Sequence, residues 1–308
     1  YLNYNFSKNK LSVQTGLRFE NTNISGYRYG NPTQKDSSFS RPYNNLFPTV
    51  YLMYQLDSAA KNVLSFSYGR RIDRPNYQSM NPFTYPLDRF TLYSGNPYLQ
   101  PTFSNNFEIA HTWKNSITST LHYSYVKNVI SETIEQQSNT FYSRPGNIGS
   151  QHSYGISVNG SRQMKKWWTL QLYTAVMQNR FTSLLYGQDL NNSGAYWYMA
   201  PTNQFTIGKT WTAELAGTYQ TSIATGQFVI VPVWSVRAGA SKKIMKNKGI
   251  IKVNISDIFY TNKPGGDIKA IANSSANWNS YLDTRVFTIS LSYRFSKGKA
   301  LAARNTGG

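Results

Sequence analysis

The sequence predicts an all-β fold, an antiparallel transmembrane β-barrel with about 13 strands in residues 1–295. Apolar and polar residues alternate with period two in segment after segment, and no long segment shows a convincing helical period. The connections also alternate strictly between short, lysine-rich turns and longer loops rich in Tyr, Asn, Gly and Pro. Short turns on one side and long loops on the other are typical of a bacterial outer-membrane barrel.

Composition supports this fold class. The 308 residues are 40% apolar and 15% aromatic, yet the mean hydropathy is -0.50, so polar residues interrupt the apolar ones regularly. The longest apolar run, Phe228 to Trp234, is far shorter than the about 20 residues of a membrane-spanning helix. The chain has no Cys, which excludes disulfides and Cys nucleophiles. Tyr1 already begins a strand-like pattern, so we expect that a leader was removed or that the start is missing.

The strands follow from the alternation, which is clearest where Phe287, Ile289 and Leu291 face one side and Thr288 and Ser290 the other. The expected strands are residues 1–6, 11–24, 45–57, 61–71, 104–113, 116–127, 151–163, 167–180, 195–207, 211–220, 228–242, 249–259 and 284–295. Most reach the about 9 to 11 residues that a tilted spanning strand needs. Bacterial single-chain barrels carry an even number of strands, so thirteen suggests part of a larger barrel.

The positive charge has a particular placement. The chain carries 32 Lys and Arg against 13 Asp and Glu, a net charge of +19 that raises nucleic acid as a partner. The lysines, however, gather in or beside the short turns, as at Lys61, Lys114 and Lys165. A cationic rim beside lipid headgroups explains this placement, so we expect outer-membrane lipid and no nucleic acid as a partner. Aromatic residues near strand ends, such as Trp113 and Trp211, fit interfacial girdles better than a soluble sandwich or propeller.

Several motifs resemble a known family. They are Arg-Arg-Ile-Asp-Arg-Pro-Asn-Tyr at 70–77, Asn-Pro-Phe at 81–83, Gly-Asn-Pro-Tyr-Leu-Gln-Pro at 95–101, Leu-Phe-Pro at 46–48 and Ser-Asp-Ile-Phe at 256–259. In this order they are similar to the outer-membrane β-barrel family of Bacteroidetes, relatives of the TonB-dependent receptors. The resemblance covers most of the chain.

The resemblance implies more than the fold. It implies that these strands are the C-terminal part of a 22-stranded barrel in the outer membrane of a Gram-negative bacterium. The function would be TonB-dependent uptake of a nutrient such as a siderophore, glycan or peptide. Implied partners are an N-terminal plug domain and a TonB-type energy transducer, both acting through a missing N-terminal region, the barrel-assembly machinery and a surface lipoprotein. We expect residues 296–308 to form a flexible basic tail.

Two groups of residues are candidates for binding. The loop from 71 to 103 combines aromatic residues with amide and guanidinium donors, which suits sugars, siderophores or peptides. Its candidate residues are Arg74, Tyr77, Asn81, Phe83, Tyr85, Arg89, Tyr93, Asn96 and Tyr98. Alternatively, the prolines of this loop stiffen a lid packed on its neighbours, and Asp73 and Asp88 form salt bridges with its arginines. The charges expected to face the lumen and dock a plug are Arg18, Glu20, Glu108, Glu214, Arg237 and Lys252.

Catalysis is not expected. His111 and His122 flank one turn but lie on opposite faces of their strands, and His152 lies in a different hairpin. No serine, histidine and acid are forced together, and no phosphate loop, zinc signature or calcium loop occurs, so we expect no catalytic residue, metal or cofactor. Two alternatives stay open: a non-transporting surface scaffold or adhesin on the same barrel, and an outer-membrane hydrolase.

Overall fold

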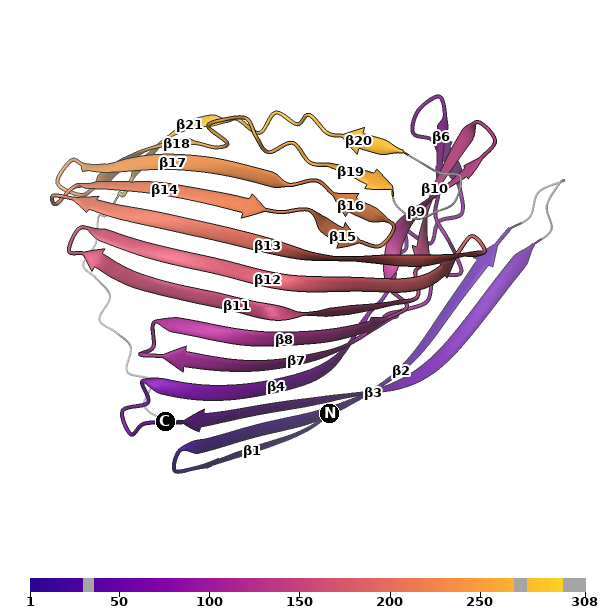
Figure 1. Ribbon diagram of the computed structural model, residues 1–308, viewed down its shortest axis with the longest axis horizontal. Coiled ribbons are helices and arrows are strands. Elements are labelled where there is room, and N and C mark those ends of the chain that lie inside the picture. The colour runs from indigo at the N-terminus through magenta and orange to yellow at the C-terminus, as the bar shows by residue number, and fades with distance from the viewer. Residues whose placement is uncertain (30–35, 269–275, 296–308) are drawn as a thin grey trace.

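A computed structural model describes residues 1–29, 36–268 and 276–295. Thirteen strands form one antiparallel sheet, with β1 and β21 at its two edges (Figure 1). In order across the sheet they are β1 (Leu2–Lys8), β2 (Leu11–Arg28), β3 (Ser37–Gln55), β4 (Asn62–Asp73), β7 (Thr102–Trp113), β8 (Ile117–Lys127), β11 (Ser150–Lys165), β12 (Trp168–Leu185), β13 (Gln188–Ile207), β14 (Trp211–Gln220), β17 (Val233–Ile244), β18 (Gly249–Ile255) and β21 (Phe287–Tyr293). No helix in the described ranges is long and apolar enough to cross a membrane.

Two smaller sheets lie at the end of the large sheet that carries the long loops (Figure 1). One has the strand order β5-β6-β10-β9, from β5 (Thr84–Pro86), β6 (Thr91–Ser94), β10 (Thr140–Asn147) and β9 (Ile130–Gln137). The other has the order β15-β16-β19-β20, from β15 (Ile223–Thr225), β16 (Phe228–Ile230), β19 (Gly265–Ile268) and β20 (Asn277–Asn279). In the first, β6 and β10 pair in parallel although the β7–β8 hairpin separates them along the chain.

The all-β class and the thirteen predicted strands are confirmed, with differences at the long loops. The predicted loop at 181–194 is wrong, because β12 and β13 continue to a tight turn in which Tyr186 and Gly187 have φ of 51° and 76°. The predicted strand at 228–242 begins only at Val233. Pro232 has no N–H for a sheet, and residues 228–230 instead form β16. The predicted tail at 296–308 lies outside the described residues.

The register keeps the apolar residues on one face of the sheet. Phe66 lies opposite Ile109, Ile109 opposite Leu121, Leu121 opposite Ile156, and Ile156 opposite Val176. Leu121 is 55% exposed and Val176 52% exposed, so this row has no protein layer over it. A continuous apolar row without a covering layer is the lipid-facing surface of a barrel wall.

The opposite face is polar. There Ser67 lies opposite Glu108, and Glu108 lies opposite His122. Further along, Asn106 lies opposite Ser124 and accepts a hydrogen bond of 2.7 Å from its hydroxyl. These residues are offset by one position from the apolar row, so they face the lumen side of the wall.

The best-packed part of the molecule lies at the loop end. The largest fully buried side chains are Ile148, Leu190, Gln227, Thr133 and Ser143, and all of them come from loops or the extracellular ends of strands. A barrel wall has hydrocarbon on one side and a lumen on the other, so its sheet encloses no core of its own. The most deeply buried part of the protein therefore lies in the loops.

The short-turn end has the chemistry of a membrane interface. Lys114 lies with its Nζ 4.4 Å from the centre of the Trp113 ring, and Lys242 lies 4.8 Å from that of Trp211. Lys114 and Asn115 have positive φ, 50° and 53°, as a two-residue hairpin turn requires. Tryptophan bodies with ammonium groups beside them suit the headgroup level.

The two faces predict opposite effects of adding charge. We expect Leu121→Arg to destabilise the barrel in a bilayer by about 2–4 kcal/mol, because it places a guanidinium in hydrocarbon. Urea titration of the folded fraction in liposomes measures this change. The neighbouring Thr120→Arg, which faces the lumen, is the control, and equal losses for the two variants would contradict the assignment of faces.

Candidate functional site

The long loops form one structure, which we call the loop cap and define as residues 74–101, 128–149, 186–187, 221–232 and 256–268. The cap lies at the ends of the strands, opposite the short turns (Figure 1). Parallel pairing of β6 with β10 joins the first two segments, and pairing of Phe228 with Ile268 joins the last two. The side chain of Gln227 links the two small sheets.

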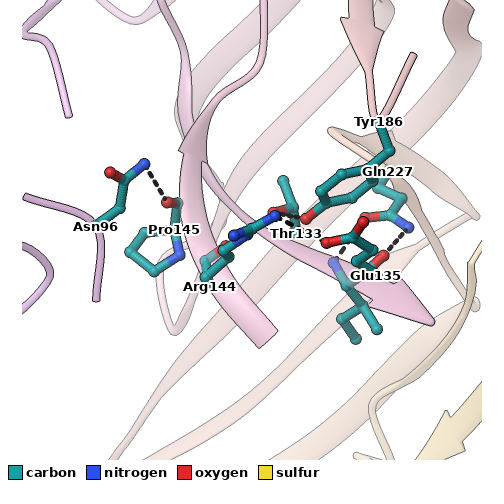
Figure 2. Close-up of polar contacts among 8 residues, drawn as sticks. Asn96, Thr133, Glu135, Arg144, Pro145, Tyr186 and Gln227 are labelled. Carbon is teal, nitrogen blue, oxygen red and sulfur yellow. Dashed lines mark hydrogen bonds and ion pairs between the residues drawn. The ribbon is translucent and has the colours of Figure 1, made fainter. Parts of the chain in front are cut away.

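Gln227 is fully buried, and its side-chain amide pairs with the backbone of β9 as a neighbouring strand would. The Ile134 N–H donates to Oε1 at 2.9 Å, and Nε2 donates to the Ile134 carbonyl at 3.0 Å (Figure 2). Beside it, Gly226 has a φ of 55°, and a Cβ added there would lie 2.8 Å from the Ser131 hydroxyl and 2.9 Å from Ile148. Only glycine fits this close approach without movement of its neighbours.

The tip of the β12–β13 hairpin joins the cap through Tyr186. The Tyr186 hydroxyl lies 2.7 Å from the Thr133 hydroxyl, and the Arg144 guanidinium carbon lies 5.5 Å from the centre of the Tyr186 ring (Figure 2). Arg144 also forms an ion pair of 2.8 Å with Glu135 across the β9–β10 hairpin. Residues 128–149, 186–187 and 221–232 are therefore held together by side chains that lie far apart in sequence.

The second small sheet packs on the lumen face of the wall. Asn179 of β12 donates to the Ala224 carbonyl at 3.1 Å, and Asn192 of β13 donates to the carbonyls of Gly226 and Phe228 at 3.0 and 2.9 Å. The register places both asparagines on the polar side of the sheet. The loop cap therefore folds inward over the lumen and narrows its entrance.

The Gly-Asn-Pro motif at 95–101 fastens the first loop to the cap. A Cβ on Gly95 would lie 2.3 Å from the Asn81 carbonyl oxygen, which requires glycine. Asn96 donates through Nδ2 to the Pro145 carbonyl at 3.2 Å, as Figure 2 shows, and its Oδ1 accepts the Tyr98 N–H at 2.9 Å. Asn96, a predicted ligand-binding residue, is thus committed to holding two loops together.

Arg74 links the two predicted sets of site residues. Its Nη2 forms an ion pair of 2.5 Å with Glu20, and its Nε donates to the Tyr43 hydroxyl at 3.3 Å. Glu20 in turn pairs with Arg18 at 2.7 Å. Arg74, which was predicted to bind ligand, therefore joins Glu20 and Arg18, which were predicted to face a plug. The three side chains form one row of ion pairs at the entrance.

The other predicted loop residues divide into packed and exposed ones. Tyr85 and Tyr93 pack with ring centres 5.2 Å apart and ring planes tilted by 40°, and burial raises the pKa of the Tyr93 phenol. Tyr77, Phe83 and Tyr98 are 90%, 74% and 68% exposed. These three are the predicted residues best placed to meet a ligand from outside.

Asn81 and Arg89 have local roles. Asn81 Oδ1 accepts the Phe83 N–H at 3.2 Å, and Arg89 lies 5.6 Å from the centre of the Phe90 ring. The predicted salt bridges of Asp73 and Asp88 with the loop's arginines do not occur among the described residues. Asp88 instead accepts the backbone N–H of Phe90 at 2.7 Å, and such bonds hold the pKa of Asp88 below its ordinary value.

A cavity of about 340 Å³ opens between the first loop and the wall. Its lining is formed by residues 42–45 of β3, residues 99–101 of the loop, and Ile24, Met80 and Phe103. These residues combine prolines and apolar side chains with the amides of Asn44, Asn45 and Gln100. Amide groups in an apolar hollow at the entrance can orient a small ligand. The sequence pattern did not indicate the contribution of β3.

The predicted lumen charges all lie on the polar face, where most find partners. Glu214 lies 3.6 Å from Arg237, and Glu108 lies 3.2 Å from His122. Lys252 faces Ser290 across the β18–β21 pair and has no ion-pair partner in the described part of the chain. His111 lies on the opposite face from His122, as predicted.

One expectation about catalysis is wrong in its geometry. His122 places Nε2 2.7 Å from the Ser157 hydroxyl while its Nδ1 faces Glu108 at 3.2 Å, so a serine, a histidine and an acid do meet. Three adjacent strands, β7, β8 and β11, supply them. Ser157 is only 6% exposed, and the backbone N–H groups around it are engaged in the sheet, so no oxyanion donor lies beside it in the part of the chain that the structure describes. The arrangement is a polar ladder on the lumen wall.

The Ser-Asp-Ile-Phe motif at 256–259 organises the loop after β18. Asp257 is 4% exposed and accepts hydrogen bonds from the N–H groups of Thr261 and Asn262, each at 3.0 Å, and from the Thr284 hydroxyl at 2.6 Å. Burial acts to raise the pKa of Asp257, but these bonds outweigh it and hold the pKa below its ordinary value.

The geometry of the wall and the loop cap defines a class of protein. A wall with one lipid-facing side, one polar lumen side, short turns at one end and an inward-folded cap at the other is an outer-membrane β-barrel. The chain belongs to the outer membrane protein beta-barrel family, whose model matches residues 1–293. It therefore resides in the outer membrane.

Solved structures show the same fold at low identity. The copper transporter OprC is 11% identical over 94% of this chain and 48% of its own, with a TM-score of 0.65. The siderophore receptor PiuA from Acinetobacter baumannii is 11% identical over 93% and 41%, with a TM-score of 0.62. The hemophore receptor HasR of Serratia marcescens, in complex with its hemophore HasA and heme, is 15% identical over 93% and 49%, with a TM-score of 0.54. This chain spans about half the length of these proteins or less, and no curated protein matches its sequence.

The close approach at Gly95 predicts a local effect. In Gly95→Ala the new Cβ would displace the Asn81 carbonyl, so the first loop should detach from the cap while the wall stays folded. Limited trypsin digestion should then cut at Arg89 faster than in the wild type. Gly69→Ala is the control, because its Cβ would meet only Thr49 at 3.9 Å. Unchanged digestion of Gly95→Ala would contradict the assigned role.

Asp257 predicts a dependence on pH. Because its pKa is lowered in the folded protein, its stabilisation of the loop is present above the unfolded value of about 3.9 and is lost as pH falls through the lower folded value. Hydrogen exchange at the Thr261 and Asn262 amides, corrected for intrinsic rates, should stay slow from neutral pH down to this range and then accelerate. In Asp257→Asn exchange should be fast at every pH, and acceleration of the wild type already near neutral pH would argue against this role.

Proposed function

We propose that this barrel is the C-terminal part of a receptor that binds a nutrient outside the cell and imports it in a TonB-dependent manner, without catalysis. The observation that carries the proposal is the entrance. Above the polar lumen wall lie an inward-folded cap, an adjacent cavity of about 340 Å³ and the row of ion pairs from Arg74 to Arg18. The structural neighbours include a copper transporter, a siderophore receptor and a hemophore receptor, and these names support import as the function.

The lumen wall supports a plug as a partner. Glu214, Arg237 and Lys252 are partly exposed charged groups on the lumen face, and a plug domain would supply further hydrogen-bond partners for them. The plug and the TonB-type transducer belong to this proposal, as do the barrel-assembly machinery and a surface lipoprotein. The cavity is neutral in its own lining, which favours a ligand bound by amides and apolar contacts, such as a peptide or glycan, over a strongly anionic one.

A specific observation also favours the scaffold or adhesin alternative. Tyr77 and Phe83 are 90% and 74% exposed on the first loop, and exposed aromatic residues suit contact with another macromolecule. Such a protein would bind its partner at the surface without accumulating anything inside the cell.

Uptake with and without TonB separates the two functions. Cells that produce the full-length protein are given labelled ferric siderophores, heme, copper, and defined peptide and oligosaccharide pools. We expect at least one probe to accumulate only when TonB is present, while surface binding persists without it. Surface binding with no TonB-dependent accumulation of any probe would favour the scaffold.

The loop residues can be tested with the same probes. We expect Tyr98→Ala to weaken binding of the accumulated probe by about tenfold, because Tyr98 adjoins the cavity residue Leu99 and truncating an aromatic anchor costs at least this much. Equilibrium binding to purified protein measures the effect. Tyr29→Ala, which removes a tyrosine that is 84% exposed directly after the end of β2, should leave binding unchanged.

A further inference from the structure

The lipid-facing side of β13, β14 and β17 contains a groove. Its volume is about 530 Å³, and residues such as Pro201, Gly217 and Val236 form its floor while Trp197 and Trp234 stand beside it. The pairing of β13 with β14 is interrupted here, between Met199 opposite Tyr219 and Thr202 opposite Ala216. The groove exists because Gly217 contributes no side chain to an otherwise filled apolar surface.

The space above Gly217 is unoccupied by protein. A Cβ at this position would lie 3.4 Å from the Ser235 carbonyl oxygen and 4.0 Å from the nearest Val236 methyl. Both are ordinary contact distances, so a larger side chain would extend into the groove without a clash. The surface is therefore hollowed where an extra side chain could have filled it.

Aromatic rings mark the upper end of the groove. Trp197 packs against Tyr219 with ring centres 5.6 Å apart, and Trp234 packs against Phe259 at 5.7 Å. Trp197 Nε1 donates to the Thr174 hydroxyl at 2.8 Å. Amphipathic rings gather at the level of lipid headgroups, so the groove runs from this level toward the middle of the bilayer.

Two cations lie beside this aromatic end. Lys263 places Nζ 4.5 Å from the centre of the Tyr260 ring, and the Arg285 guanidinium carbon lies 5.6 Å from it. Tyr260 directly follows Phe259, and the Ile258 N–H donates to the carbonyl of the groove residue Val236 at 2.8 Å. Within the described residues neither cation forms an ion pair, although both are exposed.

Nearby carboxylates leave these cations available. Asp257 is buried and its oxygens accept bonds from Thr261, Asn262 and Thr284. Asp283 is close in sequence to Arg285 but pairs with neither cation. The local charge at the top of the groove therefore favours an anion.

We propose that this groove binds a phosphorylated lipid of the outer leaflet, with an acyl chain along Gly217 and a phosphate at Lys263 and Arg285. An apolar groove that ends in unpaired cations at headgroup level matches the two parts of such a molecule. A soluble nutrient does not match, because the groove faces hydrocarbon rather than the lumen. This site is independent of the proposed transport function.

Native mass spectrometry of the full-length protein in detergent tests the proposal with lipid A as the probe. We expect the double variant Lys263→Gln/Arg285→Gln to bind lipid A about 30-fold more weakly, because two cations near a headgroup together contribute about 2 kcal/mol. Lys242→Gln is the control, since it removes an equivalent lysine over Trp211 at the opposite rim. Equal binding by the double variant and the wild type, or an equal loss in the control, would overturn the proposal.

A second variant tests the groove itself. Gly217→Leu should fill it and weaken lipid A binding while leaving the cations in place. Lipid A without its phosphates should bind the wild type weakly and should no longer distinguish it from Lys263→Gln/Arg285→Gln. Heat-modifiable migration on gels verifies that each variant is folded, and undiminished lipid A binding by folded Gly217→Leu would sink the assignment of the acyl chain.

Discussion

Alternation of side chains across a hydrogen-bonded wall is the constraint on which this structure depends. In hydrocarbon no backbone group can remain unpaired, so the strands must stay in register through the bilayer. A shift by one residue would turn Leu121 and Ile156 to the lumen and Glu108 and His122 to lipid. Regular strand pairing is interrupted in two places in the wall, at Gln163 and at Pro201. The second of these interruptions lies at the groove, where Pro201 is among the lining residues.

The same constraint explains why the buried core lies in the loops. A wall one sheet thick has no second layer, so the largest fully buried side chains of the described residues lie in the loops and at the strand ends beside them. There the cap uses polar side chains as substitutes for backbone pairing, as Gln227 does against Ile134. Glycines at 95 and 226 permit the close approaches that this packing needs. The cap is therefore a small soluble-type domain assembled from separate connections.

What the sequence could predict follows from the range of the interactions. Strand number, the two faces and the lumen charges were predictable, because period-two alternation is local and one register satisfies all of it. The tight turn at Tyr186 and Gly187 was missed because its residues read equally well as loop residues. The contacts of Gln227 with Ile134, of Tyr186 with Thr133 and of Arg74 with Glu20 leave no local pattern, so the arrangement of the entrance could not be predicted. The meeting of Ser157 with His122 and Glu108 depends on the relative stagger of three strands, which alternation alone does not determine.

The parallel pair β6 and β10 has a consequence for biogenesis. Its two partners lie on either side of a hairpin that crosses the bilayer twice, so they cannot meet until that hairpin has been inserted and both flanking segments have reached the cell exterior. Maturation of the exterior is thus a late event, separate in time from closure of the wall.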